Sequence, residues 1–132
     1  MKVFFEDKNR VSIQLDFDDS MISDLVDDLA MGSIPFLRIE DDEGGYLQCA
    51  GEGQSLTVEL RVNRFTDFKH YVIGTSNQSK VWVMIQCSVG PIRVLEHEVL
   101  SKEDVKRLLL SFNNSGDISS SFIKRNVTKL YK

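Results

Sequence analysis

Residues Phe36 to Arg61 read FLRIEDDEGGYLQCAGEGQSLTVELR, three strand-like runs separated by short polar turns. From Ser55 to Val62, apolar and polar side chains alternate, as expected of a strand that buries one face. Strands joined by turns this short pair antiparallel, because parallel neighbours need a crossover of a dozen or more residues. The stretch therefore predicts the middle of an antiparallel sheet.

The first turn of this stretch contains four consecutive acids, Glu40 to Glu43, followed by two glycines. A three-residue loop at 43–45 would pair Asp42 with Tyr46 and would gather the apolar side chains of both strands on one face. Register follows burial, so we predict this loop, with Gly45 in the left-handed bulge position. In this interpretation the acids belong to a polar hairpin rather than to a metal or catalytic site.

Further strand-like segments lie on both sides of this stretch. Val81 to Ser88 is apolar on both faces near its start, which is typical of a central strand. The first two segments should form a hairpin about the polar turn at residues 7–10. The predicted strands are 2–6, 11–15, 36–42, 46–50, 55–62, 68–73, 81–88 and 92–95.

Two segments have the period of an amphipathic helix. The first runs from Asp18 to Gly32 and is acidic on its outer face. Ser101 begins the second, with Asp104 at capping-box spacing, and Gly116 can end it. The apolar faces consist of Ile22, Leu25, Val26 and Leu29 in the first helix and of Val105, Leu108, Leu109 and Phe112 in the second.

The length and composition fit one globular domain. The chain has 132 residues, of which 42% are hydrophobic and 27% charged, and this excludes wholesale disorder. No apolar run approaches the roughly 20 residues that span a bilayer, and the first residues lack the apolar segment of a signal peptide. We therefore predict a cytoplasmic α+β domain over residues 1–132, with a mainly antiparallel, twisted sheet packed by two amphipathic helices. Residues 117–132 are compatible with a short helix, a strand or a loosely packed tail.

The segment from Asp16 to Asp28 has the spacing of acids seen in calcium-binding loops, but it lacks two essential features. Met21 occupies the position that requires glycine, and the last ligand position is Asp27 instead of a bidentate glutamate. The apolar residues of the segment also follow a helical period. We expect a solvated helix face and no metal site.

Motifs for other chemistry are equally weak. The sequence has no phosphate loop, nucleophile elbow or HExxH motif. His70 and His97 have no nearby cysteine or second histidine, and Cys49 and Cys87 lack metal-ligand spacing, so we expect both to be buried reduced thiols. Glu40 and Asp42 could act as paired carboxylates only if one lay in a closed apolar cleft. We predict no cofactor, no catalytic residue and no enzymatic activity.

The distribution of charge bears on the partner. Arg61 to Tyr71 interleaves basic and aromatic residues, a pattern typical of single-strand nucleic-acid binding. The whole chain has a net charge of −4, which would repel a polyanion, so we expect no direct nucleic-acid binding. Residues 1–60 hold 14 acids and 4 bases (net −10), whereas 61–132 hold 6 acids and 12 bases (net +6). Such asymmetry can steer a charged partner unless folding interleaves the two halves.

The stretch from Phe36 to Arg61 resembles small immunity proteins of bacterial polymorphic-toxin systems, a group that includes contact-dependent growth inhibition. The resemblance covers about a fifth of the 132 residues. It consists of an FL-x-apolar strand, an acid-and-glycine turn, Y-apolar-Q-x-x-G and a V-E strand in this order. The corresponding positions are Phe36, Leu37, Ile39, Gly45, Tyr46, Gln48, Gly51, Val58 and Glu59.

This resemblance implies a protein that binds and neutralises one cognate toxin C-terminal domain, often a nuclease, without contacting nucleic acid or membrane. Carboxylates could pair with the lysines and arginines that a nuclease uses to bind phosphates. An alternative is a small cytoplasmic ligand-binding or accessory protein-binding module; the oligomeric state is left open. On charge alone, the candidate toxin-binding residues are Asp24, Asp27, Asp28, Asp41, Asp42 and Glu43.

Overall fold

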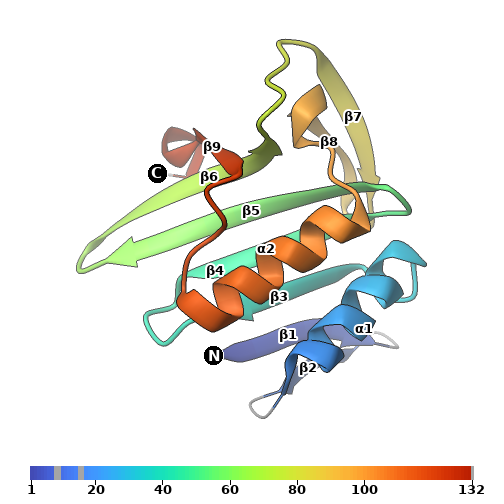
Figure 1. Cartoon of the computed structure of the whole chain (residues 1–132), viewed down its shortest axis with the longest axis vertical. Coiled ribbons are helices and arrows are strands. Elements are labelled where there is room, and N and C mark those ends of the chain that lie inside the picture. Colours follow the sequence, from blue (N-terminus) through green and yellow to red (C-terminus); the bar gives the residue numbers. More distant parts are fainter. Residues whose placement is uncertain (8–9, 15–16, 132) are drawn as a thin grey trace.

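A computed structural model of the chain describes residues 1–7, 10–14 and 17–131 (Figure 1). Within these ranges the protein has an α+β fold with a seven-stranded antiparallel sheet, a separate two-stranded hairpin and two α-helices. The strand order in the large sheet is β2-β1-β3-β4-β5-β6-β9. The predicted fold class is confirmed.

The elements follow one another along the chain with short connections. The strands are β1 (Lys2–Asp7), β2 (Arg10–Gln14), β3 (Phe36–Glu40), β4 (Tyr46–Glu52), β5 (Ser55–Arg64), β6 (Asp67–Thr75), β7 (Trp82–Cys87), β8 (Gly90–Leu95) and β9 (Phe122–Asn126). The helices are α1 (Asp19–Ala30), α2 (Lys102–Ser115) and two 3₁₀ turns, η1 (Glu96–Glu98) and η2 (Thr128–Tyr131). β1 and β2 form the predicted first hairpin; the predicted turn residues Lys8 and Asn9, and also Leu15, lie outside the described residues.

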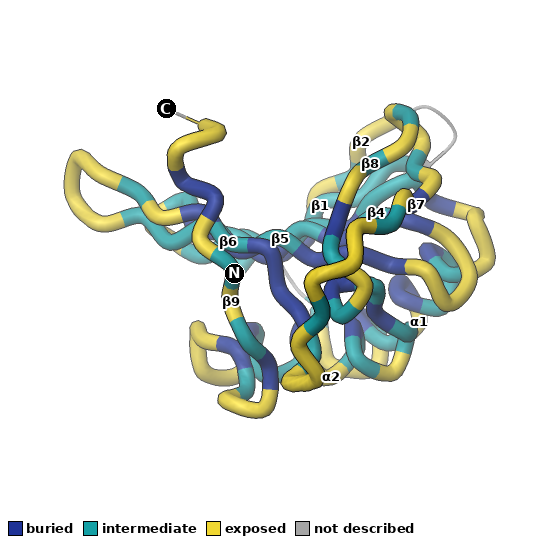
Figure 2. Tube along the Cα trace, turned by 90° about the horizontal axis from the view of Figure 1, so that it is seen from above, coloured by how far each residue is buried: buried dark blue, intermediate teal, exposed yellow. Residues whose placement is uncertain are grey.

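The core lies between one face of the sheet and the two α-helices (Figures 1 and 2). On β5, Val58 and Leu60 point into it, while Glu59 and Arg61 point to the opposite face, which we call the outer face. The predicted apolar faces of both helices are buried. Cys49 also lies in this core as a free thiol, and burial raises its pKa, whereas Cys87 is free and only partly buried.

Capping residues begin both helices, and both predicted caps of α2 are confirmed, whereas α1 ends at Ala30 with Met31, not Gly32, in the C-cap position. The Asp18 carboxylate accepts a hydrogen bond from Met21 N at 2.9 Å and caps α1. Ser101 and Asp104 form a capping box at the start of α2, and Gly116, with φ of 77°, ends it. The acids that resembled a calcium loop therefore belong to a helix and its cap, apart from Asp16, which lies outside the described residues.

The prediction that Val81 to Ser88 forms a central strand is wrong. β7 pairs with β8 in a separate hairpin that packs on the outer face of the sheet, where Ile85 and Val94 form a second buried cluster with Val72 and Val127. The other side of β7 is exposed, with Trp82 and Met84 44% and 56% accessible. One side of β7 is apolar because it packs on the sheet. The other side is also apolar, but its residues are exposed.

The predicted register of the β3–β4 hairpin is shifted by two residues. Glu40, not Asp42, pairs with Tyr46, so residues 41–45 form the loop. The carboxylate of Asp41 accepts hydrogen bonds from the backbone N–H groups of Glu43 and Gly45, both at 2.9 Å. These hydrogen bonds stabilise the loop at residues 41–45, which is longer than the loop at 43–45 predicted from burial. The shift preserves the predicted faces, but the left-handed glycine is Gly44, with φ of 83°.

The segment after α2 is packed against the sheet and is not a loose tail. β9 pairs with β6 at the edge of the sheet, and η2 follows, so the segment contains both a strand and a helical turn. Phe122 and Val127 are buried. Arg125 on β9 forms two hydrogen bonds with the fully buried carboxylate of Glu98, at 2.8 and 2.9 Å, which ties β9 to η1.

Among the described residues, no helix combines the length and the apolar character needed to cross a lipid bilayer.

Replacing Asp41 with alanine should lower the free energy of unfolding by about 1–2 kcal/mol, because two backbone donors of the loop lose their acceptor. Urea unfolding monitored by circular dichroism measures this change. Asp42→Ala is the matched control, since Asp42 is exposed in the same loop and its replacement should change stability by less than about 0.5 kcal/mol. Equal effects of the two substitutions would show that the Asp41 hydrogen bonds do not stabilise the loop.

Candidate functional site

The acids of α1 differ in their surroundings. Asp24 is exposed and Asp28 is partly exposed. Asp27 lies 2.8 Å from Lys106 Nζ and 3.6 Å from Lys102 Nζ, and the hydrogen bond to Lys106 holds the pKa of Asp27 below its ordinary value. Asp27 therefore links α1, in the acidic half of the sequence, to α2, in the basic half. This contact partly cancels the charge asymmetry along the sequence.

The other three candidate acids lie together in the β3–β4 loop. The Asp41 carboxylate is engaged in the loop itself, whereas Asp42 and Glu43 are exposed. Figure 1 shows this loop and α1 at separate places on the molecule. The structure thus does not bring the six acids into one surface, and Asp27 and Asp41 already have internal partners.

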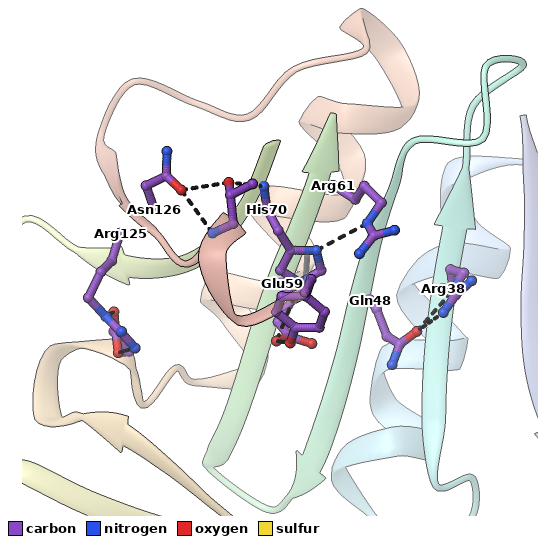
Figure 3. Close-up of polar contacts among 10 residues, drawn as sticks. Arg38, Gln48, Glu59, Arg61, His70, Arg125 and Asn126 are labelled. Carbon is purple, nitrogen blue, oxygen red and sulfur yellow. Dashed lines mark hydrogen bonds and ion pairs between the residues drawn. The ribbon is translucent and has the colours of Figure 1, made fainter. Parts of the chain in front are cut away.

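Polar side chains gather instead on the outer face of the sheet, across β3 to β6, where Figure 3 shows Arg38, Gln48, Glu59, Arg61 and His70. Aromatic rings lie among them. The cross-strand register places Arg61 between Tyr46 and His70, and Gln48 between Arg38 and Glu59. Because directly opposed residues share a face, these side chains form adjacent rows. We call the following group the arginine–aromatic cluster: Arg38, Tyr46, Arg61, Phe68, His70 and Tyr131.

Two guanidinium groups organise this cluster by lying over aromatic rings. Arg38 is 4.0 Å from the centroid of the Tyr46 ring, and it donates hydrogen bonds to Oε1 of Gln48. The Arg61 guanidinium is 4.2 Å from the ring centroid of Phe68 and 5.7 Å from that of Tyr46. Such cation–π contacts contribute about 0.5–2 kcal/mol each, so the side chains are ordered before any partner binds.

His70 lies beneath this surface and is fully buried. The ring of Tyr131 stacks on it, with centroids 3.9 Å apart. Arg61 Nε donates to His70 Nδ1 at 3.2 Å, so the proton of the neutral ring is on Nε2, 3.5 Å from a Glu59 carboxylate oxygen. The same oxygen accepts a hydrogen bond from the Tyr131 hydroxyl at 2.7 Å.

The electrostatic surroundings keep both rings neutral. Burial lowers the pKa of His70, and the positive charges of Arg61 and Arg38 lower it further, whereas Glu59 opposes them. Burial and then the Glu59 carboxylate raise the pKa of Tyr131. A covered, neutral imidazole held in one tautomer is typical of a structural histidine. A general base, in contrast, must be able to reach its substrate.

Glu40 and Asp42 do not form a pair of catalytic carboxylates. Glu40 lies on the sheet, 4.0 Å from Arg38, and Asp42 is exposed in the loop. Neither occupies the closed, partly apolar cleft that would raise a carboxyl pKa for acid catalysis.

Two depressions adjoin the cluster. The first, of about 360 Å³, is open and is lined by Phe4, Val11, Phe36, Arg38 and Gln48. The second, of about 300 Å³, is more enclosed and lies between the outer face, the β7–β8 hairpin and η2. It has a mainly apolar wall and includes Glu59, Trp82, Arg93, Arg125 and Tyr131.

Most residues of the cluster lie in sequence segments that suggest unrelated roles. Tyr46 belongs to the resemblance motif, and Arg61 and Phe68 belong to the segment that interleaves basic and aromatic residues. Tyr131 and Arg38 were not singled out. The available signal was the alternation of polar residues on neighbouring strands, but joining them required the cross-strand register and the position of η2.

In the part of the chain that the structure describes, no three His, Cys, Asp or Glu side chains gather as metal ligands would. Comparison of the chain with protein-family models, with curated protein sequences and with solved structures found no match.

Stability should fall as the pH is lowered from about 7.5 to 5.5, because the unfolded imidazole gains a proton near pH 6.5 while folded His70 resists protonation. The folded-state pKa is depressed, so the stabilising contribution is present above the unfolded pKa and is lost as the pH falls. Urea unfolding of the wild-type protein and of His70→Gln at several pH values measures this dependence. Over this pH range the free energy of unfolding of His70→Gln should decline less than that of the wild type.

His97→Gln is the matched control, because it removes the other histidine of the chain and should leave the His70 contribution intact. If His70→Gln and the wild type lose stability in parallel on acidification, the neutral state of His70 does not contribute.

Proposed function

We propose that this protein is a non-catalytic immunity protein that binds a cognate toxin C-terminal domain in the bacterial cytoplasm and neutralises it. It does so by covering the active site or the substrate-binding surface of the toxin, for which a nuclease is the expected type. The observation that supports this proposal best is the arginine–aromatic cluster on the outer face.

The composition of the cluster suits a protein interface. Arginine and tyrosine are enriched among the residues that contribute most binding energy at interfaces. Arg38 and Tyr46 are partly exposed and already held by mutual stacking. A partner that binds them immobilises few additional side chains, which lowers the entropic cost of association. The adjoining open depression, with Phe4 and Phe36 in its wall, supplies apolar surface beside the polar groups.

Negative charge lies at the margin of this surface. Glu43 belongs to the loop that directly precedes Tyr46, and Asp42 is exposed beside it. These carboxylates suit a toxin whose phosphate-binding surface is basic. Asp24 and Asp28 lie apart on α1 and are assigned to long-range attraction of the toxin rather than to direct contact.

A second candidate function is the binding of a small molecule in the enclosed depression near Trp82. Its volume of about 300 Å³ is at the lower end of the range for small-molecule sites, and such sites combine apolar walls with a few polar groups. Arg93 lies 4.4 Å from the Trp82 ring centroid at this site, where a ligand carboxylate or phosphate could pair with it.

Co-expression with the product of the adjacent upstream gene tests the immunity function. The expected results are rescue from toxicity, co-purification and nanomolar affinity. Tyr46→Ala and Arg38→Ala should each weaken binding at least about tenfold, a loss typical of central interface residues. Met31→Ala is the control: Met31 is 75% exposed and follows α1, away from the cluster.

Circular dichroism and urea unfolding verify that the variants fold. A non-toxic upstream product, together with absence of binding, would overturn the proposal. In that case, stabilisation of the wild-type protein by a metabolite in a thermal-shift screen, and its loss in Trp82→Ala, would favour the ligand-binding function.

A further inference from the structure

The β5–β6 hairpin ends in a turn that extends beyond the rest of the chain (Figure 2). Arg64 pairs with Asp67, so Phe65 and Thr66 form the turn. Phe65 has φ of 53° and a relative exposure of 108%. Two-residue hairpin turns normally place glycine or asparagine at positive φ, because a bulky side chain is strained there. This turn therefore combines backbone strain with complete exposure of an aromatic ring, and neither stabilises the free protein.

The turn is joined to the acidic β3–β4 loop. Asn63 Nδ2 donates a hydrogen bond to the carbonyl oxygen of Glu43 at 3.0 Å. A Cβ atom at Gly44 would lie only 3.1 Å from the same Asn63 nitrogen, and Gly44 has positive φ, so glycine permits this close approach. We call residues 41–45 and 64–67 together the double tip.

The double tip presents apolar surface and negative charge side by side. Phe65, Arg64, Asn63 and Glu43 line a depression of about 410 Å³. Asp42 and Glu43 are exposed next to it. Next to the turn, Asn63 pairs with Phe68, whose ring lies under the Arg61 guanidinium, so the double tip is continuous with the arginine–aromatic cluster.

We infer that the double tip is the anchor of the toxin interface: Phe65 enters an apolar pocket on the toxin, and Asp42 and Glu43 pair with lysines or arginines at the rim of that pocket. This inference rests on the proposed function and adds the contact region and the chemistry of the surface that it recognises. Interfaces commonly bury aromatic side chains at their core, while the rim is polar. The same carboxylates would disfavour an anionic lipid surface.

The strain at Phe65 makes a clear test possible. Asparagine tolerates positive φ much better than phenylalanine does, so Phe65→Asn should fold with equal or higher stability than the wild type. Its affinity for the toxin should nevertheless fall at least about tenfold, because the apolar pocket loses its occupant. Titration calorimetry or surface plasmon resonance with the purified toxin domain, inactivated if necessary, measures the affinity; urea unfolding measures the stability.

Val89→Asn is the matched control. Val89 is 88% exposed at the turn of another hairpin, β7–β8, and its replacement should leave toxin affinity unchanged. The double variant Asp42→Asn/Glu43→Gln should slow association and reduce its dependence on salt concentration, because the paired charges at the rim are lost.

The outcomes separate this inference from the proposed function. If the wild type neutralises the toxin and Phe65→Asn binds it as tightly, the anchor is elsewhere although the immunity function stands. If the wild type binds no toxin, the proposed immunity function itself is wrong. Two further results would overturn the assignment of the partner: self-association of the isolated wild type that Phe65→Asn abolishes, or Phe65-dependent binding to phosphatidylglycerol-containing vesicles.

Discussion

The alternation of apolar and polar residues across the paired strands β3, β4, β5 and β6 is the constraint on which the rest of the structure depends. In one row, Leu37, Cys49 and Val58 are directly opposed and all are buried. Their neighbours in sequence form the row of Arg38, Gln48 and Glu59 on the outer face. A shift of one residue in the strand register would exchange the two faces and expose the core side chains. The register therefore determines both which side chains are buried and which form the outer surface.

The two faces then acquire different partners. The inner face is covered by α1 and α2, whose apolar stripes complete the core. The outer face is only partly covered, by the β7–β8 hairpin and η2. Tyr131 of η2 closes over His70, and this turns a polar row of the sheet into an ordered cluster. The uncovered part retains stacked arginine and tyrosine side chains, and it leads toward the exposed Phe65.

The differences between expectation and structure have identifiable causes. The predicted strand extends to Asp42 because a three-residue loop gathers the apolar side chains of both strands on one face, but the Asp41 carboxylate bonds to two backbone N–H groups and the strand ends at Glu40. The prediction of a central strand at Val81 to Ser88 rests on the apolar residues on both of its faces, and nothing local distinguishes such a run from a hairpin packed on the sheet. The sequence alone predicts a solvated carboxylate at Asp27, since its lysine partners are 75 and 79 residues away in sequence (102 − 27 and 106 − 27).

The sequence by itself determined the α+β class, both α-helices, the caps of α2, most strands, and which side chains of β3 to β5 share a face, because these follow from local periodicity and capping chemistry. Only the tertiary structure decided which exposed groups lie together. The arginine–aromatic cluster unites residues as distant as Arg38 and Tyr131, and the double tip depends on the contact between Asn63 and Glu43. Such groupings arise from register and packing between distant segments, which local patterns do not specify.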